Sequence, residues 1–299
     1  MGVPLRGGTA LESLIMRLNW VVPARPPGSP APGPGPMTAA SHVSSRANPL
    51  LKEVRRAIQR GSLTADGCCV AESFHLLEEA LRSGCEVRAV LAAEPVEEAV
   101  ARLVRRRKGL RHVVLPEALF NALAATDSPQ GVMALVHAPV WTAADVLAGE
   151  PLVVVLDGVQ DPGNAGAIVR AAEAFGASGA FFVKGTVSPY NPKTLRASAG
   201  SVFRLPVVGG LDPAGVVNLL DRRGVPCFVT DAHAGASPDQ TVLRPPCALV
   251  IGSEGRGAGM AFGEAPRIHI PISGVESLNA AMAAGILLYE AARQRRVSR

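Results

Sequence analysis

Residues 152–177 read LVVVLDGVQDPGNAGAIVRAAEAFGA, and this stretch carries the strongest evidence on the fold. Residues 152–156 are an uninterrupted apolar run, which is typical of a strand buried on both faces of a parallel sheet. A Pro-Gly turn follows, and Asn164 is placed to cap a new helix. The stretch therefore predicts a strand, a tight turn and a helix, the unit from which parallel α/β sheets are built.

The predicted helix has one apolar face and one notable charge off that face. Ile168, Ala171, Ala172 and Phe175 recur at helical spacing and form the predicted core face. Arg170 lies about 200° around the helix from Ile168, so its side chain points away from the core. Periodicity alone favours an ordinary solvated arginine at this position.

Downstream, short apolar runs alternate with helical patterns to the end of the chain. The further strand candidates are 180–183, 202–208, 225–230, 248–251 and 267–270. The last helix is expected over 277–296. These elements predict a second α/β domain with a mostly parallel sheet.

Upstream, residues 48–137 show the same alternation in a smaller unit. Asn48 and Pro49 predict the start of its first helix, and Gly61 predicts the end. Residues 1–44 contain eight prolines and predict a disordered tail. The expected organisation is a tail over 1–44, a small α/β domain over 45–140, a linker over 141–150 and a larger α/β domain over 151–299.

Composition excludes several classes of protein. The 299 residues are 48% hydrophobic and 18% charged, so the chain can bury a core. Aromatics are only 4%, which argues against an RNA platform built on several exposed aromatic rings. There is no apolar run long enough to span a membrane. The five cysteines lack a CxxC pair, which favours a reducing compartment and argues against a zinc cluster.

The charge is compatible with an RNA partner but does not establish one. The formal net charge is +5, and 26 of the 30 basic residues are arginines. The planar guanidinium of arginine matches the geometry of a phosphate group with two hydrogen bonds at once, which the ammonium of lysine does not. GC-rich coding would produce the same bias, and it is the favoured explanation.

A glycine-rich segment, LVIGSEGRGAG, occupies residues 249–259 and includes Glu254. Loops at the carboxyl ends of parallel strands are where open α/β sheets bind ligands. The segment is neither GxGxxG nor a Walker loop, so a nucleotide-phosphate site is not supported. A plain turn before a short helix is the competing interpretation.

Residues 270–285 read IPISGVESLNAAMAAG and continue into the last helix. Ser277 is a reasonable helix cap. The small residues over 280–285 allow another helix to approach closely, and Met282 and Tyr289 add apolar surface. An ordinary core helix explains the pattern equally well.

Together, in this order and spacing, the three segments resemble the SpoU (TrmH-like) family of RNA 2′-O-ribose methyltransferases, in the SPOUT superfamily. The resemblance spans about 152–296 and rests on N-x5-R, GSEGRG and IP-x6-SLN. Residues 48–137 resemble, more loosely, the small substrate-binding domain that precedes the catalytic domain in many members.

The resemblance implies a role for each matching residue. Asn164 and Arg170 match the first motif, Glu254 the second, and Ser277 and Asn279 the third, so these five residues are the expected catalytic set. S-adenosylmethionine is the implied methyl donor. Its expected binding groups are mostly the backbone groups of Gly252, Ile270 and Leu278. Ala280-Ala281 depart from the Val-Ser that often follows SLN, which affects local packing and not the chemistry.

Fold and assembly follow from the same resemblance. The residues alone predict a doubly wound sheet, because true knots are nearly absent from proteins. The resemblance implies a deep trefoil knot whose crossing loops form the cofactor site. It also implies a homodimer and an RNA partner. No metal is expected, because no cluster of metal ligands is present in the sequence, and no membrane, because no apolar run is long enough to span one. The expected location is cytoplasmic, with mitochondrial import through residues 1–44 as a minor alternative.

Three alternatives stay open at this point. The RNA could be transfer RNA instead of large-subunit ribosomal RNA, which is the expectation. The chain could be a non-catalytic RNA-binding or ribosome-assembly protein, although the intact set of motif residues argues against that. A nicotinamide oxidoreductase of Rossmann type is disfavoured because no GxGxxG follows the first strand of either domain.

Overall fold

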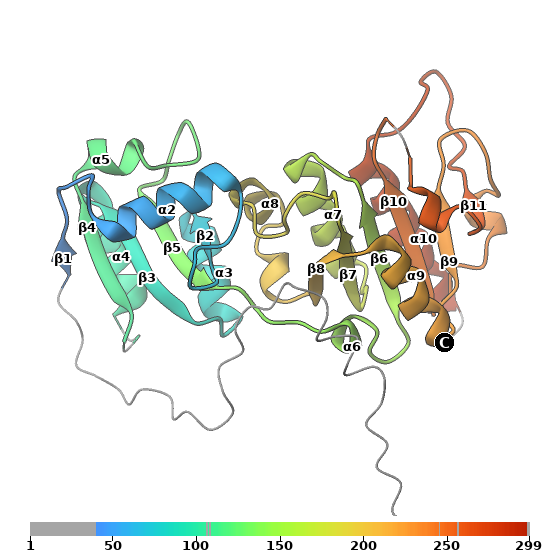
Figure 1. Cartoon of the computed structure of the whole chain (residues 1–299), viewed down its shortest axis with the longest axis horizontal. Coiled ribbons are helices and arrows are strands. Elements are labelled where there is room, and N and C mark those ends of the chain that lie inside the picture. The colour runs from blue at the N-terminus through green and yellow to red at the C-terminus, as the bar shows by residue number, and fades with distance from the viewer. Residues whose placement is uncertain (1–39, 106, 108, 245, 256, 298–299) are drawn as a thin grey trace, which may run out of the picture. The chain divides into compact units, whose positions relative to one another are not determined.

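The computed structural model describes residues 40–297 apart from 106, 108, 245 and 256. Within this part of the chain, strands and helices alternate, and the strands form two separate sheets (Figure 1). The first is a five-stranded mixed sheet and the second a six-stranded, all-parallel sheet. The α/β class predicted from the sequence is confirmed.

The N-terminal sheet has the order β1-β4-β3-β5-β2, with β5 antiparallel to both of its neighbours. Its elements are β1 (Ser41–His42), α2 (Pro49–Arg60), β2 (Cys68–Glu72), α3 (Phe74–Arg82), β3 (Val87–Ala93), η1 (Glu94–Val96), α4 (Glu97–Val104), β4 (Arg111–Leu115), α5 (Glu117–Asn121) and β5 (Val132–His137). The predicted limits of the first helix are confirmed. Asn48 Oδ1 accepts a hydrogen bond from Leu50 N at 2.9 Å, and Gly61 ends α2 at φ +57°.

The C-terminal sheet has the order β11-β9-β10-β6-β7-β8. Its elements are α6 (Ala143–Val146), β6 (Leu152–Asp157), α7 (Pro162–Ala174), β7 (Gly179–Val183), α8 (Pro192–Ala197), η2 (Ser201–Phe203), β8 (Val207–Leu211), α9 (Pro213–Arg222), β9 (Cys227–Thr230), η3 (Pro238–Gln240), β10 (Cys247–Gly252), η4 (Met260–Phe262), β11 (Arg267–Ile268) and α10 (Ala280–Val297). Because all six strands are parallel, the loops after β6, β9, β10 and β11 leave the sheet at one edge.

Four sequence expectations need correction. Residues 202–208 were expected as one strand, but Gly200 adopts φ +84° and leads into η2, so the strand begins later, as β8. The stretch 141–150 contains α6, whose Val146 is buried against the second sheet. The last helix begins at residue 280, not 277. Residues 41–42 pair with β4 and so do not belong to a disordered tail.

The structure does not test three further expectations: most of the tail, the exact domain boundaries and the knot. Most of the predicted tail, residues 1–39, lies outside the described residues. The exact domain boundaries and the threading of the knot stay predictions. In the part of the chain that the structure describes, no helix is long and apolar enough to cross a membrane.

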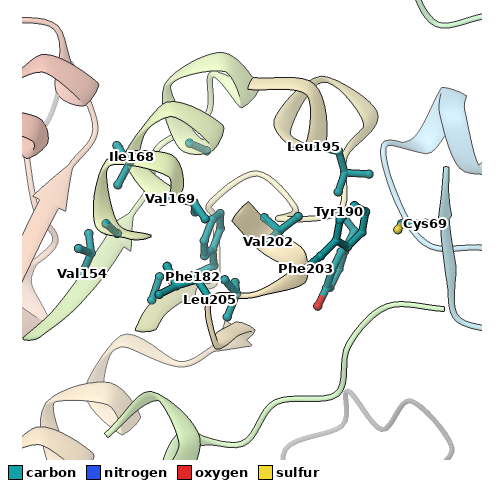
Figure 2. Close-up of a cluster of buried hydrophobic side chains, with 14 of the residues drawn as sticks. Cys69, Val154, Ile168, Val169, Phe182, Tyr190, Leu195, Val202, Phe203 and Leu205 are labelled. Atoms are coloured by element: carbon teal, nitrogen blue, oxygen red, sulfur yellow. The ribbon is translucent and has the colours of Figure 1, made fainter. Parts of the chain in front are cut away.

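One buried cluster of apolar side chains fills the space around α7 and α8 (Figure 2). It includes Ile168 and Val169 of α7 and Phe182 of β7, all at most 1% exposed. The two helices approach closely because residue 166 is glycine. A Cβ atom on Gly166 would lie 2.4 Å from the carbonyl oxygen of Thr194 in α8, so no larger residue fits without displacing the backbone.

Two arginines after β7 connect the two sheets. Glu72 at the end of β2 is 2% exposed and accepts hydrogen bonds from Thr126 Oγ1 at 2.7 Å and from Arg196 Nη1 of α8 at 3.4 Å. Arg204 donates to Glu173 of α7 at 2.6 Å and also pairs with Glu79 of α3. The helix that carries Arg170 is therefore tied to the N-terminal domain through one guanidinium.

This arrangement predicts an acid-sensitive contribution to stability. The hydrogen bond from Arg204 lowers the pKa of Glu173, and partial burial opposes that shift only in part. A lowered folded-state pKa stabilises the fold above the unfolded value, about 4.3, and the contribution is lost as pH falls below it. Arg204→Ala is expected to lower the Tm at pH 7, and the difference from the wild type should shrink in thermal melts as pH falls through the lowered pKa of Glu173. A constant difference in Tm across that range would contradict the assignment, and Arg102→Ala is the control.

Candidate active site at the carboxyl edge of the parallel sheet

The loop after β6 begins the site. Asp161 caps α7, because its Oδ1 accepts a hydrogen bond from the backbone N–H of Asn164 at 2.7 Å. The sequence pattern predicted Asn164 as this cap, and that prediction is wrong. Asp161 precedes Pro162, and an aspartate before a proline at the first helical position is a strong start signal. Asn164 lies one turn inside the helix, so its side chain is free for another task.

The glycine-rich loop after β10 forms the second wall. Ser253 and Gly257 exchange two backbone hydrogen bonds of 3.0 and 2.9 Å, which fold the loop back onto the end of the strand. A Cβ atom on Gly252 would lie 2.2 Å from the carbonyl carbon of Gly257, so this position requires glycine. Asp157, buried at the end of β6, accepts from Gly259 N at 2.6 Å and anchors the far side of the loop.

The third segment reaches the same place through Asn279. Its Oδ1 accepts from the backbone N–H groups of Ala281 at 3.0 Å and Met282 at 3.3 Å, which makes Asn279 the cap of α10. The sequence pattern predicted Ser277 as this cap, and that prediction is wrong. Because the Oδ1 atom is used by the helix, the amide Nδ2 of Asn279 is directed outward as a donor.

The three segments meet in one hydrogen-bonded cluster. Asn164 Nδ2 donates to Glu254 Oε1 at 2.5 Å. Asn279 Nδ2 donates to Asn164 Oδ1 at 2.9 Å and, more weakly, to Glu254 Oε1 at 3.4 Å. Residues separated by up to 115 positions in the sequence thus share one carboxylate–amide network. Such a network holds each amide in a single orientation, which is what a binding site for hydroxyl or phosphate groups requires.

A cleft of about 420 Å³ opens beside this cluster. Its volume falls within the usual range for sites that hold small molecules and cofactors. The sequence-predicted residues Gly252, Ile270, Ser277 and Leu278 all line it, and so does Glu254. A second cleft of about 260 Å³ contains Asn164 and shares Glu254 with the first. The carboxylate of Glu254 therefore lies where the two clefts adjoin.

An ion pair borders the larger cleft. Asp231, after β9, accepts from His233 N at 2.8 Å and pairs with Arg267 of β11. The backbone N–H of His233, followed by the Arg267 guanidinium, lowers the pKa of the Asp231 carboxyl. Among the described residues, no group of three or more His, Cys, Asp or Glu side chains is placed to hold a metal ion.

Of the predicted catalytic residues, all within the described part of the chain, Ser277 lines the larger cleft without a hydrogen bond to the cluster, and Arg170 alone lies in neither the cluster nor a cleft. Arg170 is exposed. It follows Asn164 by six residues on α7, a rise of about 9 Å along the helix. Among the described residues, no hydrogen bond or ion pair engages its guanidinium. Its side chain is therefore available to a partner molecule.

The sequence reasoning missed Asp157 and Asp161, which hold the two loops in place. Asp161-Pro162 carried a readable cap signal. Asp157 did not, because its role depends on the register of β6 with β10, which sets it opposite Gly252.

Comparison with known proteins identifies the same regions. A model of the SpoU rRNA Methylase family matches residues 151–289, and a model of the MRM3-like substrate binding domain matches 48–134. The chain is 33% identical over 250 residues to 23S rRNA (guanosine(2553)-2′-O)-methyltransferase RlmP of Bacillus subtilis, covering 83% of this chain and 97% of that protein. It is 32% identical over 269 residues to 23S rRNA (uridine(2479)-2′-O)-methyltransferase of Streptomyces viridochromogenes, covering 86% and 93%.

Two solved structures with bound AdoMet (S-adenosylmethionine) share the fold. The SpoU methyltransferase AviRb from Streptomyces viridochromogenes superposes with a TM-score of 0.77 at 29% identity, covering 84% of this chain and 99% of that chain. The rRNA methyltransferase from Sinorhizobium meliloti gives 0.75 at 30% identity, covering 85% and 98%.

The fold, the cleft and these relatives define an S-adenosylmethionine-dependent RNA 2′-O-ribose methyltransferase. The resemblance drawn from the sequence is thereby confirmed. The chain belongs to the SpoU rRNA methylase family.

The residues of the larger cleft fit the cofactor. Its lining combines apolar side chains such as Ile251 and Ile268 with the backbone of Gly252, where a side chain has no room. Apolar walls suit the adenine ring, and backbone donors and acceptors suit its polar edge.

Proposed function

We propose that this enzyme methylates one ribose 2′-hydroxyl in 23S ribosomal RNA. The single observation that carries the proposal is the cluster at Glu254, which receives hydrogen bonds from the first and third motifs beside a cofactor-sized cleft. The rRNA substrate is supported by the relatives RlmP and the uridine(2479) enzyme, which share most of their length with this chain.

Different residues bind the cofactor and stabilise the charge of the reacting ribose. Gly252, Ile270 and Leu278 hold S-adenosylmethionine, which supplies an electrophilic methyl group on sulfonium when bound. A ribose hydroxyl is a poor nucleophile at neutral pH and needs charge stabilisation as its proton leaves. Arg170, a fixed cation with a planar fork, grips the target phosphate and stabilises the forming alkoxide. A protonated guanidinium has no acceptor atom, so the hydroxyl proton leaves to water.

The polar cluster orients the reacting ribose. Asn164 and Asn279 offer amide groups held by Glu254, so they direct hydrogen bonds without first losing rotational freedom. Ser277 lines the cleft next to this cluster and adds a hydroxyl that can donate or accept.

The enzyme is proposed to act as a homodimer. Met282, Ile286 and Tyr289 are 59%, 40% and 50% exposed and lie on one face of α10. Tyr289 contacts Phe175, just after α7, edge to face at 5.8 Å, so this apolar surface reaches the helix that carries Arg170. A second copy related by two-fold symmetry is the common way to cover such a face. It would also bring a second α7 near the site.

Ile286→Glu tests the dimer. A carboxylate in the centre of the apolar face must be desolvated on association, so we expect a monomer by light scattering at micromolar concentration and weakened methylation. Val140→Glu, also at an exposed apolar position but outside α10, is the matched control. Ala284 is fully buried in the chain's own core and is unsuitable as a probe, whereas Gly285 faces open space. A fully active wild-type monomer would refute the proposal.

Methylation mapping tests the function as a whole. The purified full chain is incubated with deproteinised 23S rRNA and, separately, with total tRNA, and 2′-O-methylation is mapped on each. One modified position in 23S rRNA is expected. Modification of tRNA alone would favour the tRNA alternative, and none on either RNA would favour a non-catalytic assembly factor.

The cytoplasm is the proposed location. All five cysteines are free, and burial raises the pKa of Cys68 to about 11 and of Cys247 to about 12, so these thiols stay protonated at neutral pH. Free cysteines are the usual condition in a reducing compartment, where the rRNA substrate is also found. The alternative of mitochondrial import depends on residues outside the described part of the chain.

A further inference from the structure

Helix α2 of the N-terminal domain has one face that the fold uses and one that it does not. Leu51 and Val54 are fully buried against the sheet. Lys52, Arg56 and Arg60 are exposed and recur every fourth residue, so they form a line of cations over about 12 Å of helix. We call these three residues the α2 cation row.

The charge of the row is not balanced within the protein. Glu53 is the only acidic residue of α2, and it pairs with Arg88 at 2.8 Å on another side of the helix. Among the described residues, no carboxylate lies within ion-pair distance of any member of the row. Like charges four residues apart destabilise a helix. Arg60 in the last turn gains from the helix dipole, but the charges of Lys52 and Arg56 have no such compensation in the fold, which points to an anion outside the chain.

The row leads toward the catalytic edge. Gly61 at the end of α2 lies against Asn191, since a Cβ atom there would be 2.3 Å from Asn191 Nδ2. Asn191 caps α8, and Lys193 in its first turn lies 3.8 Å from Asp161, the cap of α7. A chain of direct contacts thus connects the row to the loop beside Asn164.

We propose that the α2 cation row binds the phosphate backbone of the RNA substrate and directs the strand toward the cleft. This inference rests on the proposed function. Lysine and arginine side chains without an aromatic partner contact phosphates more readily than base edges. The row should therefore add affinity for RNA of any sequence and leave the choice of nucleotide to the catalytic domain.

The test measures binding of the full chain to deproteinised 23S rRNA between 50 and 200 mM salt. Arg56→Ala/Arg60→Ala is expected to weaken binding and to flatten the log–log salt slope by about 1.4–1.8, at about 0.7–0.9 per lost phosphate contact. Adding Lys52→Ala should flatten it by one further contact. The matched control is Arg222→Ala/Arg223→Ala, two exposed arginines at the end of α9, which should change neither quantity.

Further readouts separate this surface from other roles. Arg56→Lys/Arg60→Lys should restore the slope, because charge and not fork geometry is required. At saturating RNA, the alanine variants should reach the kcat of the wild type. Unchanged affinity and slope, or a loss of kcat that RNA cannot rescue, would overturn the inference. If the wild type binds through the row but methylates no RNA, the proposed function fails and this surface stands.

Discussion

Arg170→Ala is expected to lower kcat for RNA methylation by at least about 10²–10³-fold, the loss typical of one group that stabilises charge in a transition state. The fold and cofactor affinity should stay nearly unchanged, because the side chain is exposed and engages no other described residue. The measurements are methyl transfer to deproteinised 23S rRNA, calorimetric titration with S-adenosylmethionine and a thermal melt.

Arg170→Lys should fail to rescue the reaction, because a compact ammonium cannot replace a planar, bidentate fork. Arg222→Ala removes an exposed arginine from α9 and is the control for loss of charge. Turnover like that of the wild type in Arg170→Ala would remove this residue from the catalytic set.

Gly252→Ala is expected to abolish cofactor binding. The added methyl would lie 2.2 Å from the carbonyl carbon of Gly257, so the loop that carries Glu254 must move away from the strand. Displacement of an active-site group by about 1 Å can cost about 10²-fold in rate. The stabilisation of about 2.7 kcal/mol that a ligand provides at a hundredfold excess over its Kd should disappear from the thermal melt.

The control makes the same change where there is room for it. Gly215 lies within α9, and its added Cβ would only reach ordinary contact, 3.9 Å from Asp212. Gly215→Ala should therefore retain cofactor binding. If Gly252→Ala also retains it, the glycine-rich loop does not form the cofactor site.

The sequence predicted the order of the elements well where one physical signal dominated. The apolar run that became β6 and the helix that became α7 needed only periodicity and a turn. The two wrong caps arose where several polar residues competed for one helix start. Asp161 and Asn164 are three residues apart, Ser277 and Asn279 are two apart, and only the tertiary contacts with Glu254 decide which amide is left free.

Other features were beyond sequence reasoning for a different reason. The cluster at Glu254 joins residues from three loops, and spacing along the chain carries no information on their distance in space. The buried role of Glu72 depends on Arg196, which follows 124 residues later. The row on α2 was visible as arginines, but its exposure and lack of partners required the fold.

The close approach at Gly166 has a consequence for how such enzymes can be recombined. Because Gly166 has no side chain, α8 packs closely against α7. Arg196 of α8 and Arg204 pair with Glu72 and Glu79 of the N-terminal domain, so the segment from α8 through Arg204 contacts both domains. A chimera that exchanges only the first 140 residues with a relative would separate Glu72 and Glu79 from the arginines matched to them. A chimera should therefore exchange two segments together, the N-terminal domain and the segment from α8 through Arg204. The rest of the parallel sheet can be kept from the original chain.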